Sequence, residues 1–401
     1  AMAGSIGAAI YLVNLPEVGG MDSIMNNENL SRKISIFPNL NDKETLWTLL
    51  IIPLAVQWWS SWYPGAEPGG GGYIAQRMLA AKNENHALGA TLFFNVMHYA
   101  LRPWPWIIVA LASLVVFPDI ESISNAFPNI EKDKLGQDLA YPAMLTFLPN
   151  GLLGLVLASL VSAYMSTIST HLNWGSSYVV NDFYKQLVNK KASEKELVKV
   201  GRFSVILLMI VSSIIALLLT NAYQLFDIIL MFGAGTGLIF ILRWFWWRIN
   251  AWSEIAAMLS SGIISIALTN ESLFNLIFND STFPVYMKFP LIVFITTSIW
   301  LIVTFLTPAD DKEILIKFYK KTKPGGPGWN MIKKDIKIDD EKEDWIVPKG
   351  ILCMLLGCIC IYSALFSTGY LIYGFIFEAS LFLITSIVFS TLLYFYSKKL
   401  F

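Results

Sequence analysis

The sequence predicts an all-α polytopic membrane protein. Of its 401 residues, 55% are hydrophobic and only 14% are charged, whereas an average soluble domain is about 25% charged. Several apolar runs, each close to the ~20 residues that cross a bilayer as a helix, follow one another along the chain. The formal net charge is zero, so the chain lacks the basic character of nucleic-acid-binding proteins. We therefore expect a lipid bilayer and no nucleic acid among its partners.

The first apolar run, residues 1–15, contains no charged side chain. It is shorter than the ~20 residues of a complete span. No basic segment precedes it and no cleavage site follows, so it does not have the pattern of a signal peptide. We interpret it as a truncated transmembrane helix.

The second run, residues 46–77, is interrupted in its middle. Residues 64–72 (PGAEPGGGG) hold two prolines and five glycines, which cannot remain helical together. If the run crosses the membrane, the break lies at membrane depth, where irregular backbone is tolerated only beside a cavity or within protein. Broken helices of this kind form substrate sites in transporters. The alternative is a glycine-rich surface loop that joins two helices.

This broken segment carries the candidate substrate or gate residues. Glu67 would be an ionisable group at membrane depth, able to bind an ammonium group, a proton or sodium; a solvated loop carboxylate is the alternative. The aromatic side chains would line a pocket or, alternatively, form an interfacial belt. The candidates are Gln57, Trp58, Trp59, Trp62, Tyr63 and Glu67.

A third run, residues 151–181, is uncharged but has a polar face. At about 100° per residue, its small and hydroxyl side chains fall on one half of the helix. One interpretation is that serine and threonine bond to their own helix carbonyls and let another helix approach. The other is that Ser166 and Thr167 supply oxygen ligands to a small cation. The polar half holds Ser162, Ala163, Ser166, Thr167, Ser169, Thr170, Asn173, Ser176 and Ser177.

The remaining chain predicts further spans and one long polar segment. Residues 307–349 are charged and contain proline and glycine, so we interpret them as a cytoplasmic linker. The glycines of residues 233–237 (GAGTG) indicate close helix packing. Arg102 lies within an apolar run and requires a partner, for which Glu67 is a candidate. The expected spans are 87–117, 202–219, 226–247, 251–268, 290–306, 350–366 and 375–396.

Charge predicts which side faces the cytoplasm. If the loop that follows Arg77 is taken as one side, most of the 29 lysines and arginines fall on that side. The positive-inside rule places it in the cytoplasm. The same bias requires residues 46–77 to cross the membrane once, which favours the broken helix over the surface loop.

Several motifs together resemble the sodium/solute symporter family, which includes the proline, sialic acid and sodium/glucose transporters. They are residues 165–169 (MSTIS), Asn173, Ser176 with Ser177, and residues 182–185 (DFYK). Residues 76–82 (QRMLAAK) are also similar to the end of a span in this family. The glycine-rich segment before them is longer than the family pattern, which puts residue-level transfer in doubt there. The resemblance covers nearly the whole chain.

The resemblance implies a leucine-transporter-type fold of two inverted repeats, with the first repeat largely missing here. The second repeat would occupy residues 46–247, with the broken helix at 46–77 and a sodium-site helix at 143–183. Residues 251–401 would be peripheral transmembrane helices with a cytoplasmic loop at 307–349. The sodium ligands would be the Ala163 carbonyl and the Ser166 and Thr167 hydroxyls, completed by a missing helix. In some members, the equivalents of Ser169 and Thr170 help to hold a second sodium ion.

We therefore expect a sodium-coupled secondary active symporter of a small organic solute, with Na+ as the coupling ion. The sequence leaves open whether the solute is an amino acid, a sugar or a carboxylate. We do not expect an enzyme. The alternative is a transporter-fold sensor or receptor domain without transport activity. The expected location is a bacterial inner membrane.

Overall fold

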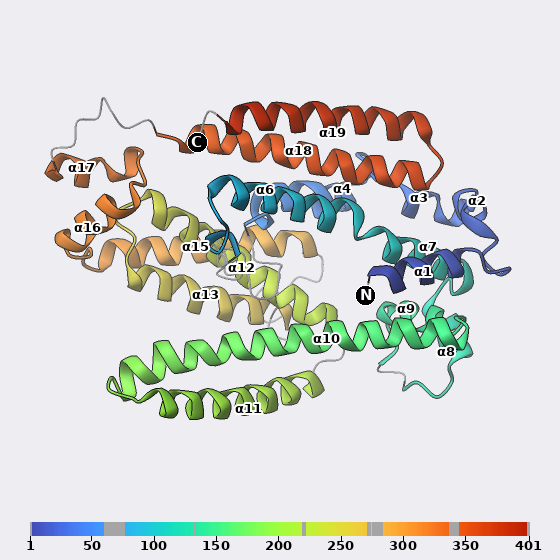
Figure 1. The fold of residues 1–401 in the computed structure, drawn as a ribbon, viewed down its shortest axis with the longest axis horizontal. Helices are drawn as coiled ribbons and strands as arrows, with labels where there is room; N and C mark the ends of the chain where they lie inside the picture. The colour runs from blue at the N-terminus through green and yellow to red at the C-terminus, as the bar shows by residue number, and fades with distance from the viewer. Residues whose placement is uncertain are drawn as a thin grey trace. The chain divides into compact units, whose positions relative to one another are not determined.

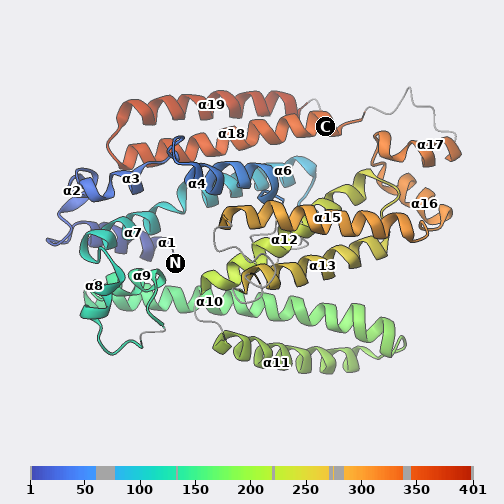
Figure 2. The same cartoon turned by 180° about the vertical axis from the view of Figure 1, so that it is seen from behind.

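The computed structural model describes residues 2–59, 77–131, 134–218, 222–270, 274, 284–336 and 345–398. All regular elements in these ranges are helices, drawn in Figures 1 and 2. Among them, seven are long and apolar enough to cross a membrane, which confirms the predicted all-α polytopic class. They are Glu84–Val116, Asn150–Val188, Glu194–Leu217, Ala251–Thr269, Lys288–Leu306, Val347–Ile372 and Ile376–Ser397; two shorter apolar helices are Met2–Val13 and Ile229–Phe245.

The chain divides into two compact units. The first comprises Ala1–Ser35, Met97–Gln224 and Thr368–Ile376, and the second comprises Ile36–Val96, Leu225–Ser367 and Phe377–Phe401. The long helical stretch Glu84–Val116 passes from one to the other: α6 (Glu84–Asn95) belongs to the second unit and α7 (Trp104–Val116) to the first. Between them, the π-helical η4 (Val96–Leu101) is followed by Pro103, which cannot donate a helical backbone hydrogen bond.

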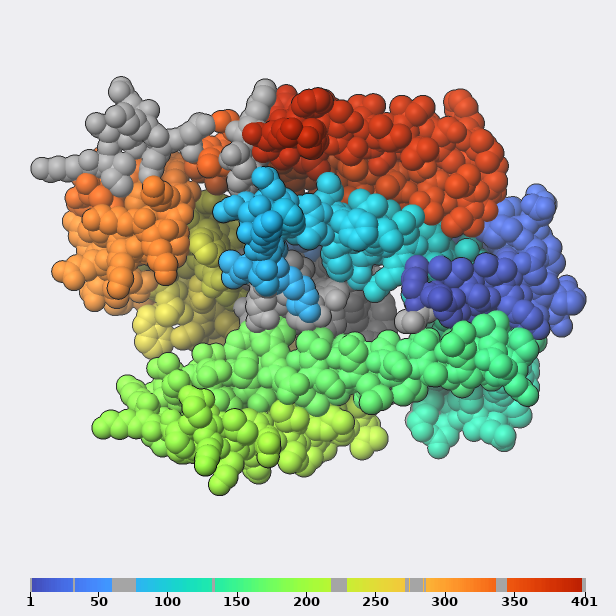
Figure 3. Space-filling view, viewed as in Figure 1, coloured from blue at the N-terminus to red at the C-terminus, as the bar shows by residue number. Residues whose placement is uncertain are grey.

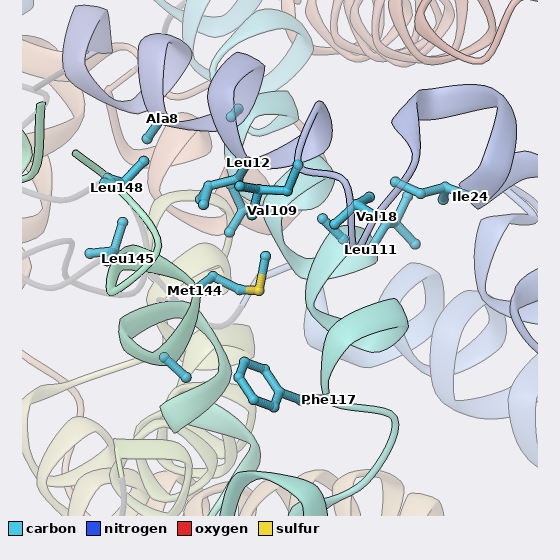
Figure 4. Packing of buried hydrophobic residues seen from close by; sticks show 14 of the residues in the cluster. Ala8, Leu12, Val18, Ile24, Val109, Leu111, Phe117, Met144, Leu145 and Leu148 are labelled. Carbon is cyan, nitrogen blue, oxygen red and sulfur yellow. The ribbon is translucent and has the colours of Figure 1, made fainter. Parts of the chain in front are cut away.

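The first unit is built around an apolar core beneath its short N-terminal helix. Ala8 and Leu12 of α1 (Met2–Val13) are fully buried, together with Val109 of α7 and Met144 of α9. Figure 4 shows these side chains converging from separate elements. The other helices of this unit are α2 (Gly20–Met25), η1 (Glu28–Leu30), α3 (Ser31–Ile34), α8 (Ile120–Ala126), η6 (Gln137–Leu139), α9 (Ala140–Leu145), α10 (Asn150–Tyr178), η7 (Val179–Val188) and α11 (Glu194–Leu218).

The predicted sodium-site helix differs from its expected bounds of 143–183. It begins at Asn150 as α10 and continues through the π-helical η7 to Val188, whereas residues 140–145 form the separate helix α9. Pro149 causes the break, because a proline holds the preceding residue out of the helical conformation and is itself extended here, with ψ of 148°. Figures 1 and 2 both show α11 returning beside α10.

The DFYK motif lies at this turn between α10 and α11. The Tyr184 hydroxyl donates to Glu196 Oε1 at 2.6 Å, and Asn189 Nδ2 donates to the same oxygen at 3.1 Å. The motif tyrosine therefore ties the end of η7 to the first turn of α11.

The second unit contains the segment before the glycine-rich stretch and the later helices. Figures 1 and 2 show α13 and α15 lying side by side, and likewise α18 and α19. Ser386 Oγ of α19 donates to the Cys360 carbonyl of α18 at 2.9 Å, and all three cysteines are free thiols. Beside α6, its helices are α4 (Lys43–Leu46), η2 (Trp47–Ile51), η3 (Pro53–Gln57), α12 (Ala222–Phe245), α13 (Ala251–Thr269), η8 (Val285–Met287), α15 (Lys288–Leu306), α16 (Lys312–Thr322), η9 (Pro327–Trp329), α17 (Asn330–Ile336), α18 (Val347–Ile372) and α19 (Ile376–Ser397).

Part of residues 307–349, interpreted as a linker, forms helices. Residues 312–336, here called the α16–α17 module, fold around the buried side chains of Leu315, Tyr319 and Trp329. Trp329 Nε1 donates to the Trp244 carbonyl at 2.9 Å, which docks the module on the end of α12. The buried side chains of Leu315, Tyr319 and Trp329 stabilise this fold. Many charged residues lie between them in the sequence, so the apolar spacing is difficult to recognise.

We expect Trp329→Ala to undock the α16–α17 module, because Trp329 is 2% exposed and a buried tryptophan truncated to alanine costs roughly 3–5 kcal/mol. Limited trypsin digestion should then cut at Lys317 to Lys323 faster than in the parent protein. Trp252→Ala is the control, because Trp252 is 60% exposed. Equal digestion of both variants would contradict the docking.

Candidate functional site

The polar stretch of α10 lies between two packed ends of the helix. Near the start, Gly4 of α1 lies against Val156 and Ser159. Near the end, Ser176 Oγ donates to the Gly201 carbonyl of α11 at 2.9 Å. Only Val156 and Ser176 are buried in α10, and Figure 3 shows this helix uncovered on the face in view. The candidate ligands between the packed ends are exposed, except Thr170, which is half-buried; they are Ala163, Ser166, Thr167, Ser169 and Thr170.

The two threonines of this stretch bond to the preceding turn of their own helix. Thr167 Oγ1 donates to the Ala163 carbonyl at 2.9 Å, and Thr170 Oγ1 donates to the Ser166 carbonyl at 2.9 Å. His171 Nδ1 lies 2.8 Å from the Thr167 carbonyl. This is the local bonding that the first interpretation of the polar face predicted.

This bonding is compatible with cation binding by the same atoms. A hydroxyl has one donor hydrogen and two acceptor lone pairs, and a carbonyl oxygen has two lone pairs. When Thr167 donates its hydrogen to Ala163, the lone pairs of its oxygen remain available, and the Ala163 carbonyl keeps a second one. Ser166 and Ser169 are exposed. The stretch can therefore present several uncharged oxygen atoms to a small cation.

The second candidate region is described only in part. Gln57 and Trp59 are half-buried and Trp58 is 55% exposed. Residues 46–57 are helical, as α4, η2 and η3. Three of the candidates lie outside the described residues, as does the glycine-rich break: Trp62, Tyr63 and Glu67.

Trp59 is held by α12. Its indole Nε1 donates to the Ala234 carbonyl at 2.9 Å, and its ring and backbone lie against Gly237, where a Cβ atom would overlap them. Gly235 is similarly close to Ser261 of α13, whose hydroxyl donates to the Phe232 carbonyl at 2.8 Å. The prediction that residues 233–237 mediate close packing is confirmed. The sequence pattern did not identify Trp59 as the contacting residue.

Arg102 finds an aromatic partner in the first unit. Its guanidinium carbon lies 6.0 Å from the ring centroid of Trp106, one turn further along the helix, within the range of a cation–π interaction. His98 is 9% exposed and packs edge-on against Tyr99, with the ring centroids 4.8 Å apart. Glu67, the candidate partner of Arg102, lies outside the described residues, so their pairing stays a prediction.

The two groups of candidates belong to different units. The α10 oxygens lie in the first unit, while Gln57, Trp58 and Trp59 lie in the second. Among the described residues, no group of three or more His, Cys, Asp or Glu side chains could hold a metal ion. Uncharged oxygens on a long apolar helix, and aromatic side chains before an apolar helix of the other unit, are features expected of a membrane carrier.

Comparison with known proteins agrees with this class. The sequence model of the sodium:solute symporter family matches residues 5–261, more than half of the chain. The chain therefore belongs to the sodium:solute symporter family.

Individual relatives match over a smaller part. The chain is 33% identical to human sodium/myo-inositol cotransporter 2 over 214 residues, which is 49% of the chain and 30% of that protein. It is 27% identical to the sodium/glucose cotransporter of Vibrio parahaemolyticus over 196 residues, 47% of the chain and 36% of that protein. With the mouse sodium/myo-inositol cotransporter, 35% identity extends over 158 residues, 38% of the chain and 21% of that protein. The matches thus span about a third or less of each relative's length.

We expect Gly235→Ala to destabilise the second unit, because its new methyl group would overlap Ser261 and displace a side chain that bonds Phe232. Overpacking of this kind costs about 1–3 kcal/mol. Gly154→Ala in α10 is the control, since nothing lies within 4 Å of its Cβ position. Thermal unfolding in detergent should separate the two variants; equal midpoints would refute the tight contact.

Trp59→Phe should lower stability by at least about 1 kcal/mol, the net value of one neutral hydrogen bond, because the smaller phenylalanine ring loses the N–H that donates to the Ala234 carbonyl and part of the indole packing. Trp58→Phe is the matched control at an exposed neighbour. Denaturant unfolding of both variants is the measurement, and a larger loss for Trp58→Phe would show that the assignment of the anchor is wrong.

Proposed function

We propose that this chain forms part of a sodium-coupled secondary active symporter of a small organic solute. The observation that carries the proposal is the family match over residues 5–261, because this range includes the uncovered hydroxyl stretch of α10. The relatives named above are sodium cotransporters of myo-inositol or glucose. No covalent chemistry is needed for this activity, so we propose a transporter and not an enzyme.

The proposed sodium ligands are the Ala163 carbonyl and the hydroxyls of Ser166 and Thr167. The hydrogen bond from Thr167 to Ala163 supports this role, because it orients a hydroxyl whose lone pairs remain available. Ser169 and Thr170 are proposed to assist a second sodium ion. Sodium would stabilise the state in which the solute site is open to the outside, and its gradient would supply the driving force.

For the solute we propose a polyol or sugar. The support is the myo-inositol and glucose named for the relatives, together with Trp58 and Trp59, whose flat rings suit the apolar face of a sugar. The solute would bind along the broken segment 46–77, where Trp62, Tyr63 and Glu67 remain proposed contacts.

The remaining architectural expectations also stand as proposals. Residues 46–247 would form the second inverted repeat of a leucine-transporter-type fold, and residues 251–401 would form peripheral helices. The lysine-rich side would face the cytoplasm. A bacterial inner membrane is the proposed location.

Uptake by the full-length protein in proteoliposomes tests the proposal. Radiolabelled myo-inositol, glucose, proline and a carboxylate should be offered under inward sodium or potassium gradients. We expect the polyol or sugar to accumulate only with sodium. Ser166→Ala and Thr167→Ala should each raise the sodium concentration for half-maximal uptake by tenfold or more, since roughly 1.4 kcal/mol of lost ion binding gives that factor.

The control variant is Ser162→Ala, one turn before the proposed ligands, whose hydroxyl donates to the Ala158 carbonyl in the same way. It should leave sodium dependence unchanged, and Thr167→Ser should retain most of it. Accumulation that is equal in potassium and insensitive to Ser166→Ala and Thr167→Ala would overturn the sodium site. Solute binding without accumulation would instead support a sensor.

A further inference from the structure

The sequence of the α16–α17 module carries more positive than negative charge. Residues 312–336 contain seven lysines and only two carboxylates, Glu313 and Asp335. Lys312 Nζ forms an ion pair with Asp335 Oδ2 at 2.9 Å, and Lys333 also has a partner. The lysines are Lys312, Lys317, Lys320, Lys321, Lys323, Lys333 and Lys334.

The charge is concentrated on one face of α16. Leu315 and Tyr319 point inward, at 6% and 0% exposure, against Trp329. On a helix of 3.6 residues per turn, Lys317, Lys320 and Lys321 fall on the opposite side. Ile314, which is 59% exposed, and the acidic Glu313 also fall there. Helix α16 is thus amphipathic, with a buried apolar face and an exposed face on which three lysines lie beside an isoleucine.

The module is fixed where membrane spans end. Trp329 Nε1 bonds the Trp244 carbonyl, and the Trp247 amide donates to the Gly328 carbonyl at 3.3 Å, so the module is docked on the end of α12. Only residues 307–311 separate it from the end of α15 at Leu306.

The short connection from α15 is itself held in place. Arg248 Nη2 donates to the Thr307 carbonyl at 2.6 Å, and Asn250 Nδ2 donates to the Pro308 carbonyl at 2.9 Å. The α16–α17 module is therefore held close to the end of α15.

We propose that the exposed face of α16 binds the anionic headgroups of the membrane lipids around the ends of α12 and α15. Clusters of four to eight basic residues beside a span are attracted to anionic lipid surfaces within about one Debye length, ~8 Å at physiological salt. Ile314, and Met331 at 60% exposure on α17, supply apolar atoms for the headgroup boundary. We commit to a lipid rather than nucleic acid as the occupant, because the module is docked at the end of the apolar helix α12.

Lysine footprinting of the full-length protein tests the proposal. The protein is placed in nanodiscs of phosphatidylcholine, with or without phosphatidylglycerol, and treated with an uncharged acetylating reagent; mass spectrometry then gives the rate for each lysine. Lys317, Lys320 and Lys321 should react about fivefold more slowly in the anionic discs, the factor that roughly 1 kcal/mol per lysine gives. High salt should remove the difference.

Charge-matched variants locate the effect. With Lys317, Lys320 and Lys321 all replaced by glutamine, hydrogen exchange of the α16 amides should be the same in both disc types. The control replaces Lys190, Lys191 and Lys195 by glutamine, which removes the same charge on the turn before and the start of α11, and α16 should keep its added protection in anionic discs. Both triple variants leave Leu315, Tyr319 and Trp329 in place, so the module should stay folded.

Two results would overturn the proposal. Equal lysine reactivity in the two disc types would mean that the face is only solvated. Strong protection already in phosphatidylcholine would mean that the counter-charge lies within the protein, with the five carboxylates in the sequence of residues 337–344 as the first candidates. Neither result depends on transport, so a failure here is distinct from a failure of the symport proposal.

Discussion

Polar groups in a lipid environment must find their hydrogen-bond partners within the protein, and this constraint organises the whole chain. A backbone group left unpaired in hydrocarbon costs several kcal/mol, so spans are helical. An unpaired side-chain hydroxyl in hydrocarbon is also unfavourable. On α10, Thr167 and Thr170 donate to carbonyls one turn back, and on α15, Thr304 Oγ1 donates to the Trp300 carbonyl at 2.6 Å. The local bond satisfies the hydrogen but leaves oxygen lone pairs available.

The same constraint explains how the helices meet. Lipid chains are as apolar as the helices, so association relies on close van der Waals contact and interhelical hydrogen bonds. In the second unit, Gly235 and Gly237 remove the Cβ atoms that would separate α12 from Ser261 and Trp59. The freed space is used for hydrogen bonds from Ser261 to Phe232 and from Trp59 to Ala234. The close approach at the glycines and the hydrogen bonds therefore occur at the same positions of α12. Either contact alone would stabilise the association of these elements less.

The sequence was sufficient for the class of fold, because long uncharged runs have one stable outcome in a bilayer. It also identified the packing role of residues 233–237. Glycine has no side chain, so on a buried helix face its main effect is to let another element approach closely. The sequence misplaced the start of the sodium-site helix, because the apolar composition of residues 143–149 conceals the conformational effect of Pro149. It missed the α16–α17 module because Leu315, Tyr319 and Trp329 pack across a proline- and glycine-rich turn. The proposed solute residues could not be assigned from pattern alone, since aromatic side chains serve pockets and membrane interfaces equally well.

The uncovered stretch of α10 bears on how coupling would arise. Hard cations generally take about six oxygen ligands, whereas one helix face presents only a few, here the Ala163 carbonyl with Ser166 and Thr167. A bound sodium ion would therefore need oxygens from water or from another element. A ligand shifts a conformational equilibrium only by its difference in affinity between the two states. If the remaining ligands come from another element, sodium favours the state that brings that element to α10. The incompleteness of the proposed α10 site would then be what couples the ion to the conformational change, because a site complete on one helix would bind sodium equally in every state and shift none of them.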